Sequence, residues 1–77
     1  MLFSNRMTTI TYNDTRFGDT FNMWLDEADG YSIVGIQRFV GNIGGDPINY
    51  DSLDQLPAIY RHALEQELHR FKKNQRQ

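Results

Sequence analysis

The sequence has no cysteine and only two histidines among its 77 residues. The lack of cysteine excludes a disulfide scaffold, a thiolate nucleophile, a CxxC redox pair and a zinc knuckle, and it fits a reducing compartment. A chain this short removes only about 60% of its unfolded surface from water on folding. Its stability must therefore come from one apolar core that uses nearly every large apolar side chain.

Long hydrophobic runs are also lacking. The longest apolar cluster, residues 33–40, is interrupted by Gly35, Gln37 and Arg38, whereas a membrane span needs roughly 18 consecutive apolar residues. The apolar residues 1–3 continue directly into polar ones, which is too short for the apolar region of a secretory signal. We therefore expect no membrane association and a cytoplasmic protein.

The motifs of common enzyme families are absent too. The glycine-rich residues 41–46 contain neither GxGxxG nor the Gly-Lys-Ser/Thr ending of a phosphate-binding loop, and no GxSxG or Ser-x-x-Lys pattern marks a nucleophilic serine. Paired carboxylates are available for acid–base chemistry, but the first 60 residues contain no His or Lys to partner them. We interpret the acidic residues as solvated turn positions: Asp14, Asp19, Asp26, Glu27 and Asp29.

A metal site is the remaining catalytic option. His62, Glu65 and His69 lie near the polar side of a predicted helix, but residues seven apart are separated by about 10 Å along a helix axis. A zinc ion needs ligand atoms about 2 Å from a common centre. We therefore predict no metal site, no cofactor and no enzymatic activity.

Alternating and β-branched residues predict an antiparallel sheet. The first segment is rich in threonine, isoleucine and tyrosine, which favour a pleated strand because such side chains lose rotamer freedom in a helix. In the second segment Phe21, Met23 and Leu25 fall on one side and Trp24 on the other. Turn-forming residues separate the segments, and Gly35 indicates a bulge or a close helix contact in the third. The predicted strands are residues 7–12, 19–25, 31–40 and, as a short edge strand, 48–50.

Two alternatives remain open in the second segment. Residues 19–29 also fit a helix, since Phe21, Trp24, Leu25 and Ala28 are spaced at i, i+3, i+4 and i+7. If the segment is a strand, its register places Trp24 either on the outer face of the sheet or beneath the helix. In the third segment, plain alternation places Ile33 and Phe39 on one face and Val34, Ile36 and Val40 on the other.

The C-terminal residues predict one amphipathic helix, because apolar side chains recur every three or four residues within one stripe. Ser52 and Gln55 fit a capping box. Pro57 is tolerated only in the first turn of a helix, so we predict a helix over residues 54–72. The stripe consists of Leu53, Leu56, Tyr60, Leu64, Leu68 and Phe71.

The sequence thus predicts a small α+β fold. An antiparallel meander of three to four strands carries the C-terminal amphipathic helix on one face. We predict a single domain over residues 1–77, with disordered tails at residues 1–6 and 73–77, where apolar periodicity is missing.

Charge is distributed unevenly along the chain. Residues 1–60 carry three basic and eight acidic side chains, a net charge of −5, whereas residues 61–77 carry five basic and two acidic side chains, a net charge of +3. The acidic majority repels a polyanion and so opposes direct nucleic-acid binding. It favours a partner with a basic surface.

We therefore predict a non-catalytic protein-binding module, an inhibitor or regulator that masks a basic surface of a larger partner. An exposed tryptophan beside acidic residues is typical of an interface. Small acidic inhibitors encoded by phages and plasmids share this size and charge, by analogy only. The expected partner-binding residues are Trp24, Asp26, Glu27 and Asp29.

Two other functions are the alternatives. In a nucleic-acid-binding accessory protein, strand aromatics would stack on bases and basic C-terminal side chains would contact phosphates. The basic residues in question are Arg70, Lys72, Lys73 and Arg76. An exposed sheet edge would also suit a small homodimeric structural protein.

Overall fold

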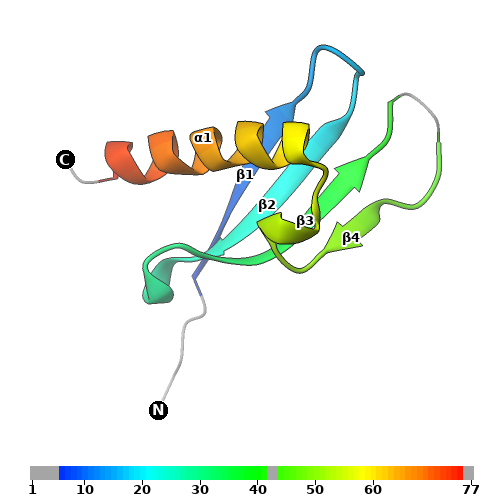
Figure 1. The fold of residues 1–77 in the computed structure, drawn as a ribbon. Coiled ribbons are helices and arrows are strands. Elements are labelled where there is room, and N and C mark those ends of the chain that lie inside the picture. The colour runs from blue at the N-terminus through cyan, green and yellow to red at the C-terminus, as the bar shows by residue number, and fades with distance from the viewer. Residues whose placement is uncertain (1–5, 42–43, 76–77) are drawn as a thin grey trace.

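A computed structural model of the chain describes residues 6–41 and 44–75. Within these residues the chain forms a four-stranded antiparallel sheet followed by one α-helix, which confirms the predicted α+β fold (Figure 1). Each strand pairs with the next along the chain, so the sheet is a simple meander. The strands are β1 (Met7–Asn13), β2 (Thr20–Asp26), β3 (Ser32–Phe39) and β4 (Ile48–Tyr50).

The segment that also fitted a helix is strand β2. Both β1 and β3 pair with it over its whole length, so its backbone groups find partners on both sides. Phe21, Met23 and Leu25 are buried under the helix. Trp24 therefore lies on the other face of the sheet, which settles the register that the sequence left open.

A bulge in β3 changes which side chains face the core. Trp24 pairs with Gly35, but the next residue of β2, Leu25, pairs with Ile33, so Val34 is an extra residue in β3. Of the two features that Gly35 indicated, a bulge or a close helix contact, the structure shows a bulge, with the neighbouring Val34 as the extra residue. The plain alternation predicted for this strand is wrong, because Ile33 and Ile36 both pack on the core side.

The turn between β2 and β3 contains a short 3₁₀ helix, η1 (Glu27–Asp29). The Asp26 carboxylate accepts a hydrogen bond from the Ala28 backbone N–H at 3.0 Å and caps this turn. Gly30 and Tyr31 follow with φ values of 62° and 63°, in the left-handed region. A tyrosine is unfavourable there, and an edge-on contact with the Phe71 ring, 5.1 Å between centroids, holds it in place.

The C-terminal helix α1 (Ala58–Asn74) begins later than predicted. Pro57 disfavours helical backbone in the residue before it, and Leu56 is accordingly extended, with φ −82° and ψ 150°. The helix continues to Asn74, into the segment predicted as a tail. Residues 1–5 and 76–77 of the predicted tails lie outside the described residues. No helix in the described part of the chain is long and apolar enough to span a membrane.

The predicted capping box does not form. A separate 3₁₀ turn, η2 (Leu53–Gln55), precedes α1, and the Ser52 side chain makes no capping hydrogen bond. The Gln55 side chain instead accepts a hydrogen bond from the Asp51 backbone N–H at 2.7 Å. The two residues thus shape the entry turn rather than the first turn of α1.

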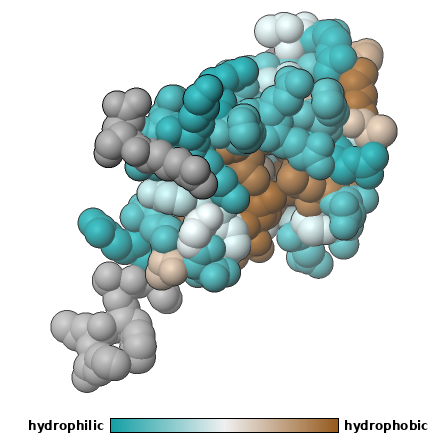
Figure 2. Space-filling model, turned by 60° about the vertical axis from the view of Figure 1, so that its left-hand side comes forward, coloured by the Kyte–Doolittle hydropathy of each residue, from teal (hydrophilic) through white to brown (hydrophobic). Residues whose placement is uncertain are grey.

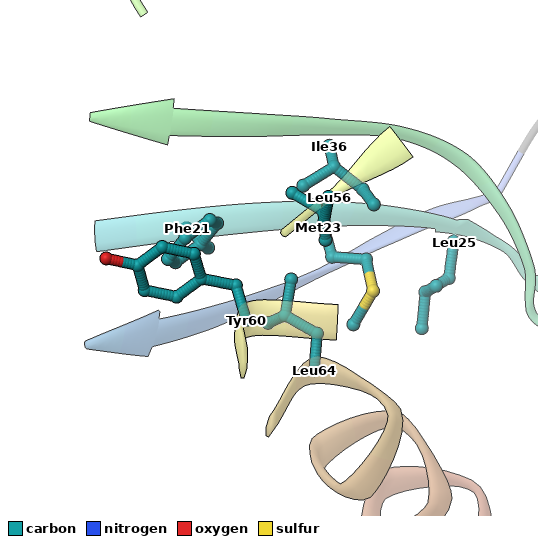
Figure 3. Close-up of a cluster of buried hydrophobic side chains, with 7 residues drawn as sticks. All are labelled: Phe21, Met23, Leu25, Ile36, Leu56, Tyr60 and Leu64. Atoms are coloured by element: carbon teal, nitrogen blue, oxygen red, sulfur yellow. The ribbon is translucent and has the colours of Figure 1, made fainter. Parts of the chain in front are cut away.

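The core lies between α1 and one face of the sheet. Figure 3 shows Tyr60 and Leu64 of α1 pointing toward the side chains of β2. The buried residues of the core are Phe21, Met23, Leu25, Ile36, Leu56, Tyr60 and Leu64. Apolar surface is also visible in a hollow between polar surfaces (Figure 2). The opposite face of the sheet carries no helix in the described part of the chain (Figure 1).

Candidate functional site

The uncovered face of the sheet, which we call the open face, is built by strand alternation and register. Thr9 and Gly35 lie directly opposite Trp24 on the neighbouring strands, and Gln37 lies opposite Asn22. Residues paired in this way project from the same face. The open face consists of Met7, Thr9, Thr11, Asn13, Thr20, Asn22, Trp24, Asp26, Ser32, Gly35, Gln37, Phe39 and Asn49.

Trp24 occupies the centre of this face, on a strand that has a neighbour on each side. Its side chain is half-buried although no layer covers it. Beside it, the space above Gly35 is unfilled, since a Cβ placed on that residue would meet no heavy atom within 4 Å. The indole therefore borders a notch in the sheet surface, into which a side chain from another molecule could fit.

Apart from Asp26 at the end of β2, the open face carries no charged side chain over its described residues. Its polar groups are hydroxyls and amides, and some bond across the strands: Thr11 donates to Asn22 at 2.8 Å and Thr20 donates to Asn13 at 3.1 Å. Exposed apolar side chains lie at its margins, with Phe39 37% exposed and the bulge residue Val34 52% exposed. A neutral surface with an aromatic centre resembles the interior of a protein interface, where charged residues are depleted.

The acidic turn next to Trp24 is less free than the sequence suggested. Asp26 caps η1, and Glu27 accepts a hydrogen bond from the Thr8 hydroxyl and lies 4.0 Å from the Arg6 guanidinium. Asp29 is exposed. The structure thus brings the predicted partner-binding residues to one end of β2, but Asp26 and Glu27 also hold the turn together.

The basic residues of the nucleic-acid alternative lie elsewhere. Arg70 donates to Glu67 within α1, and Lys72 and Lys73 lie in the last turn of α1. Because α1 covers the core face of the sheet, these cations do not join the aromatic side chain of Trp24 on the open face. Arg76 lies outside the described residues.

A buried polar cluster at one end of the core went unrecognised in the sequence. Asp19 is only 3% exposed, which contradicts its interpretation as a solvated turn residue. Its carboxylate accepts hydrogen bonds from Arg38 at 2.9 Å, from the Tyr60 hydroxyl at 3.1 Å and from the Gly41 backbone N–H at 2.9 Å. Arg38 also donates to the Tyr50 hydroxyl at 3.4 Å. We call these residues the Asp19 cluster.

The Asp19 cluster joins segments that are distant in the sequence. The guanidinium carbon of Arg38 lies 4.7 Å from the centre of the Tyr60 ring, a cation–π contact. The cluster thereby ties β3 and α1 to the start of β2. Its signal in the sequence is Arg38 itself, the only charged residue of β3, because a cation that faces the core requires a buried acceptor.

The electrostatics of the cluster follow from burial and hydrogen bonding. Burial raises the pKa of Asp19, but the hydrogen bonds from Gly41, Arg38 and Tyr60 outweigh it and hold that pKa below its ordinary value. Burial and the hydrogen bond to Asp19 raise the pKa of Tyr60. The favoured state is therefore an ionised Asp19 beside a protonated Tyr60.

Asp14 is also buried, at 2% exposure, and is again not a solvated residue. Its carboxylate accepts hydrogen bonds from the Phe17 backbone N–H at 3.1 Å and from Arg16 at 3.2 Å. Its backbone carbonyl accepts from Gly18 at 2.8 Å. Asp14 thus fixes the turn between β1 and β2.

The residues of the metal set considered in the sequence lie on α1. In the part of the chain that the structure describes, no three His, Cys, Asp or Glu side chains gather in an arrangement that could hold a metal ion. His62 instead lies 3.3 Å from the Gln66 side chain on the outer surface of α1.

The chain matches no protein-family model, and comparison with curated proteins and with solved structures found no match.

Proposed function

We propose that the protein is a non-catalytic binding module that docks a larger protein onto its open face and thereby inhibits or regulates it. The observation that carries the proposal is the placement of Trp24, half-buried at the centre of an uncovered face on which Asp26 is the only charged residue among those described, and beside the notch above Gly35. Tryptophan is enriched among the residues that dominate binding energy, and these residues cluster near the centres of interfaces.

The acidic turn would determine the orientation of a partner bound to the open face. Asp26 and Asp29 lie at the end of β2, at the border of the neutral face. A partner that covers Trp24 and carries basic residues at the rim of its own apolar patch would meet these carboxylates. Such rim charges affect association rate and orientation more than affinity.

The test is affinity capture from the native host with the wild type and three variants of the protein. Trp24→Ala removes the anchor, and Gly35→Val fills the notch with a β-branched side chain that suits a strand. Gly35 has no positive φ, so the valine requires no strained backbone. Gln66→Ala, on the outer surface of α1, is the matched control.

We expect the wild type and Gln66→Ala to capture the same partner protein. Trp24→Ala and Gly35→Val should both fail to capture it. Capture of that protein by all four forms would exclude the open face as the binding surface. The only tryptophan of the chain, Trp24, gives a second readout. Adding the purified partner should shift its fluorescence emission to shorter wavelength because the indole loses contact with water.

A further inference from the structure

Strand β1 is a free edge of the sheet. It pairs with β2 on one side, and the sheet order leaves its other side without a strand in the described part of the chain. The opposite edge, β4, has three residues, whereas β1 has seven. An unpaired strand of this length presents a row of backbone donors and acceptors that can pair with another chain.

The register shows which backbone groups point outward. Hydrogen bonds from Glu27 N–H to the Arg6 carbonyl and from Asp14 N–H to the Asp19 carbonyl bracket the strand. Because hydrogen-bonded positions alternate in an antiparallel pair, the even-numbered residues of β1 bond to β2. The odd-numbered residues direct their N–H and C=O groups away from β2: Met7, Thr9, Thr11 and Asn13.

The sequence of this edge lacks the features that usually protect a sheet edge, although α1 crosses β1 on the core side (Figure 1). Residues 7–13 contain no charged side chain and no proline, and β-branched residues with high strand propensity make up most of them. The pairing of β1 with β2 is regular, without a bulge. An uncharged strand can approach a second copy of itself without like-charge repulsion.

We propose that β1 pairs with β1 of a second copy, antiparallel, with a two-fold axis at Ile10. In this register Thr9 lies opposite Thr11 of the second copy and Met7 lies opposite its Asn13. All outward-directed residues of both strands then exchange backbone hydrogen bonds. A shift by two residues would leave one outward-directed residue of each β1 without a partner in the other.

The side chains support the same register. Ile10 faces the core side and is half-buried, so contact with Ile10 of the second copy would bury its exposed part and extend the core across the axis. Thr9 and Thr11 would form cross-strand pairs on the open face, which favour strand pairing. Just beyond the strand ends, Arg6 would lie opposite Asp14 of the second copy, so the flanking charges have opposite signs.

The dimer is tested by light scattering after size exclusion, with loading concentrations from about 1 µM to about 1 mM. The expected species is a dimer of two 9.0 kDa chains. The double variant Thr9→Lys/Thr11→Lys places lysines opposite each other and should weaken dimerisation at least tenfold. Asn49→Lys places a charge on the same face but at the β4 edge and should leave dimerisation unchanged.

The register is tested separately by disulfide formation, which the absence of native cysteine makes unambiguous. Hydrogen-bonded residues in an antiparallel pair have Cα atoms about 5.5 Å apart, within the range for a disulfide. A mixture of Thr9→Cys and Thr11→Cys chains should therefore form a disulfide-linked dimer, whereas either variant alone should not. Equal cross-linking of each variant alone would overturn the register.

A monomer at every concentration would overturn the proposal. So would a dimer that Asn49→Lys weakens and Thr9→Lys/Thr11→Lys does not, because its interface would lie at β4. Circular dichroism spectra of each variant, compared with the wild type, test whether the fold is retained. The proposal is independent of partner docking on the open face, which uses the sheet surface around Trp24 rather than the β1 edge.

Discussion

The pKa of Asp19 links its ionisation to the stability of the fold. Its pKa in the folded chain lies below its ordinary value of about 3.9. As the pH is lowered through this ordinary value, the carboxyl of the unfolded chain takes up a proton more readily than that of the folded chain. The free energy of unfolding therefore decreases as the pH decreases. We expect the stabilisation to be fully present above about pH 4 and to be lost as the pH falls through the pKa of folded Asp19.

Urea unfolding between about pH 2 and pH 7 measures this loss. Asp19→Asn keeps the size of the side chain but cannot ionise, so its stability should be lower at neutral pH and change less below pH 4. Asp46→Asn, in the exposed loop before β4, is the control and should follow the wild type. Parallel curves for wild type and Asp19→Asn would show that another carboxylate dominates.

The acidic turn makes a second prediction at the level of single residues. Asp26→Ala removes the cap of η1 and should lower the free energy of unfolding by about 1 kcal/mol. Asp29→Ala, three residues away and exposed, should change it by less than about 0.5 kcal/mol. Thermal or urea melts of the two variants make the comparison, and equal effects would mean that the cap contributes nothing measurable.

Among the elements, α1 depends on one buried leucine. Leu64 is 1% exposed and lies in the core opposite β2, so Leu64→Ala should cost about 2 to 5 kcal/mol, a large share of the total stability of a small domain. His62→Ala, exposed two residues earlier, should change stability little. Similar melting temperatures for the two variants would mean that a different face of α1 is buried.

The elements also show what the sequence can and cannot predict. The apolar stripe of the C-terminal segment is a local pattern and was correctly predicted from side-chain spacing. The alternation of β2 was recognised in the same way, but the sequence left open which of its two faces packs under the helix. The bulge residue Val34 reverses the alternation of β3, and nothing in its own sequence fixes where the extra residue sits. Pro57 was correctly recognised as a constraint, but its effect on the preceding residue moves the start of α1 further along the chain.

The candidate site also combines residues that are close in the sequence with residues that only the fold brings together. Trp24 and the acidic turn were found because they adjoin one another in the sequence. The Asp19 cluster was missed because its members come from separate segments, with Asp19 and Tyr60 41 residues apart. The notch above Gly35 depends on which residue β3 places opposite Trp24, and only the register reveals it.

At the scale of the whole molecule, the meander has a consequence for the order of folding. Each strand pairs with its sequence neighbour, so the sheet can form by closing short loops, which costs little chain entropy. The contact between Tyr60 and Asp19 instead closes a long loop. We expect the sheet to form before the rate-limiting barrier and α1 to dock after it.

Tyr60→Phe tests this order because it removes only the hydroxyl that bonds to Asp19. Loss of a hydrogen bond to a charged group should lower stability by about 1.5 kcal/mol. If α1 docks late, stopped-flow chevron plots should show unfolding about tenfold faster and refolding nearly unchanged. A slower refolding rate would place α1 in the folding nucleus. With the expected result, the Asp19 cluster determines how long the folded state persists and has little effect on how fast the chain folds.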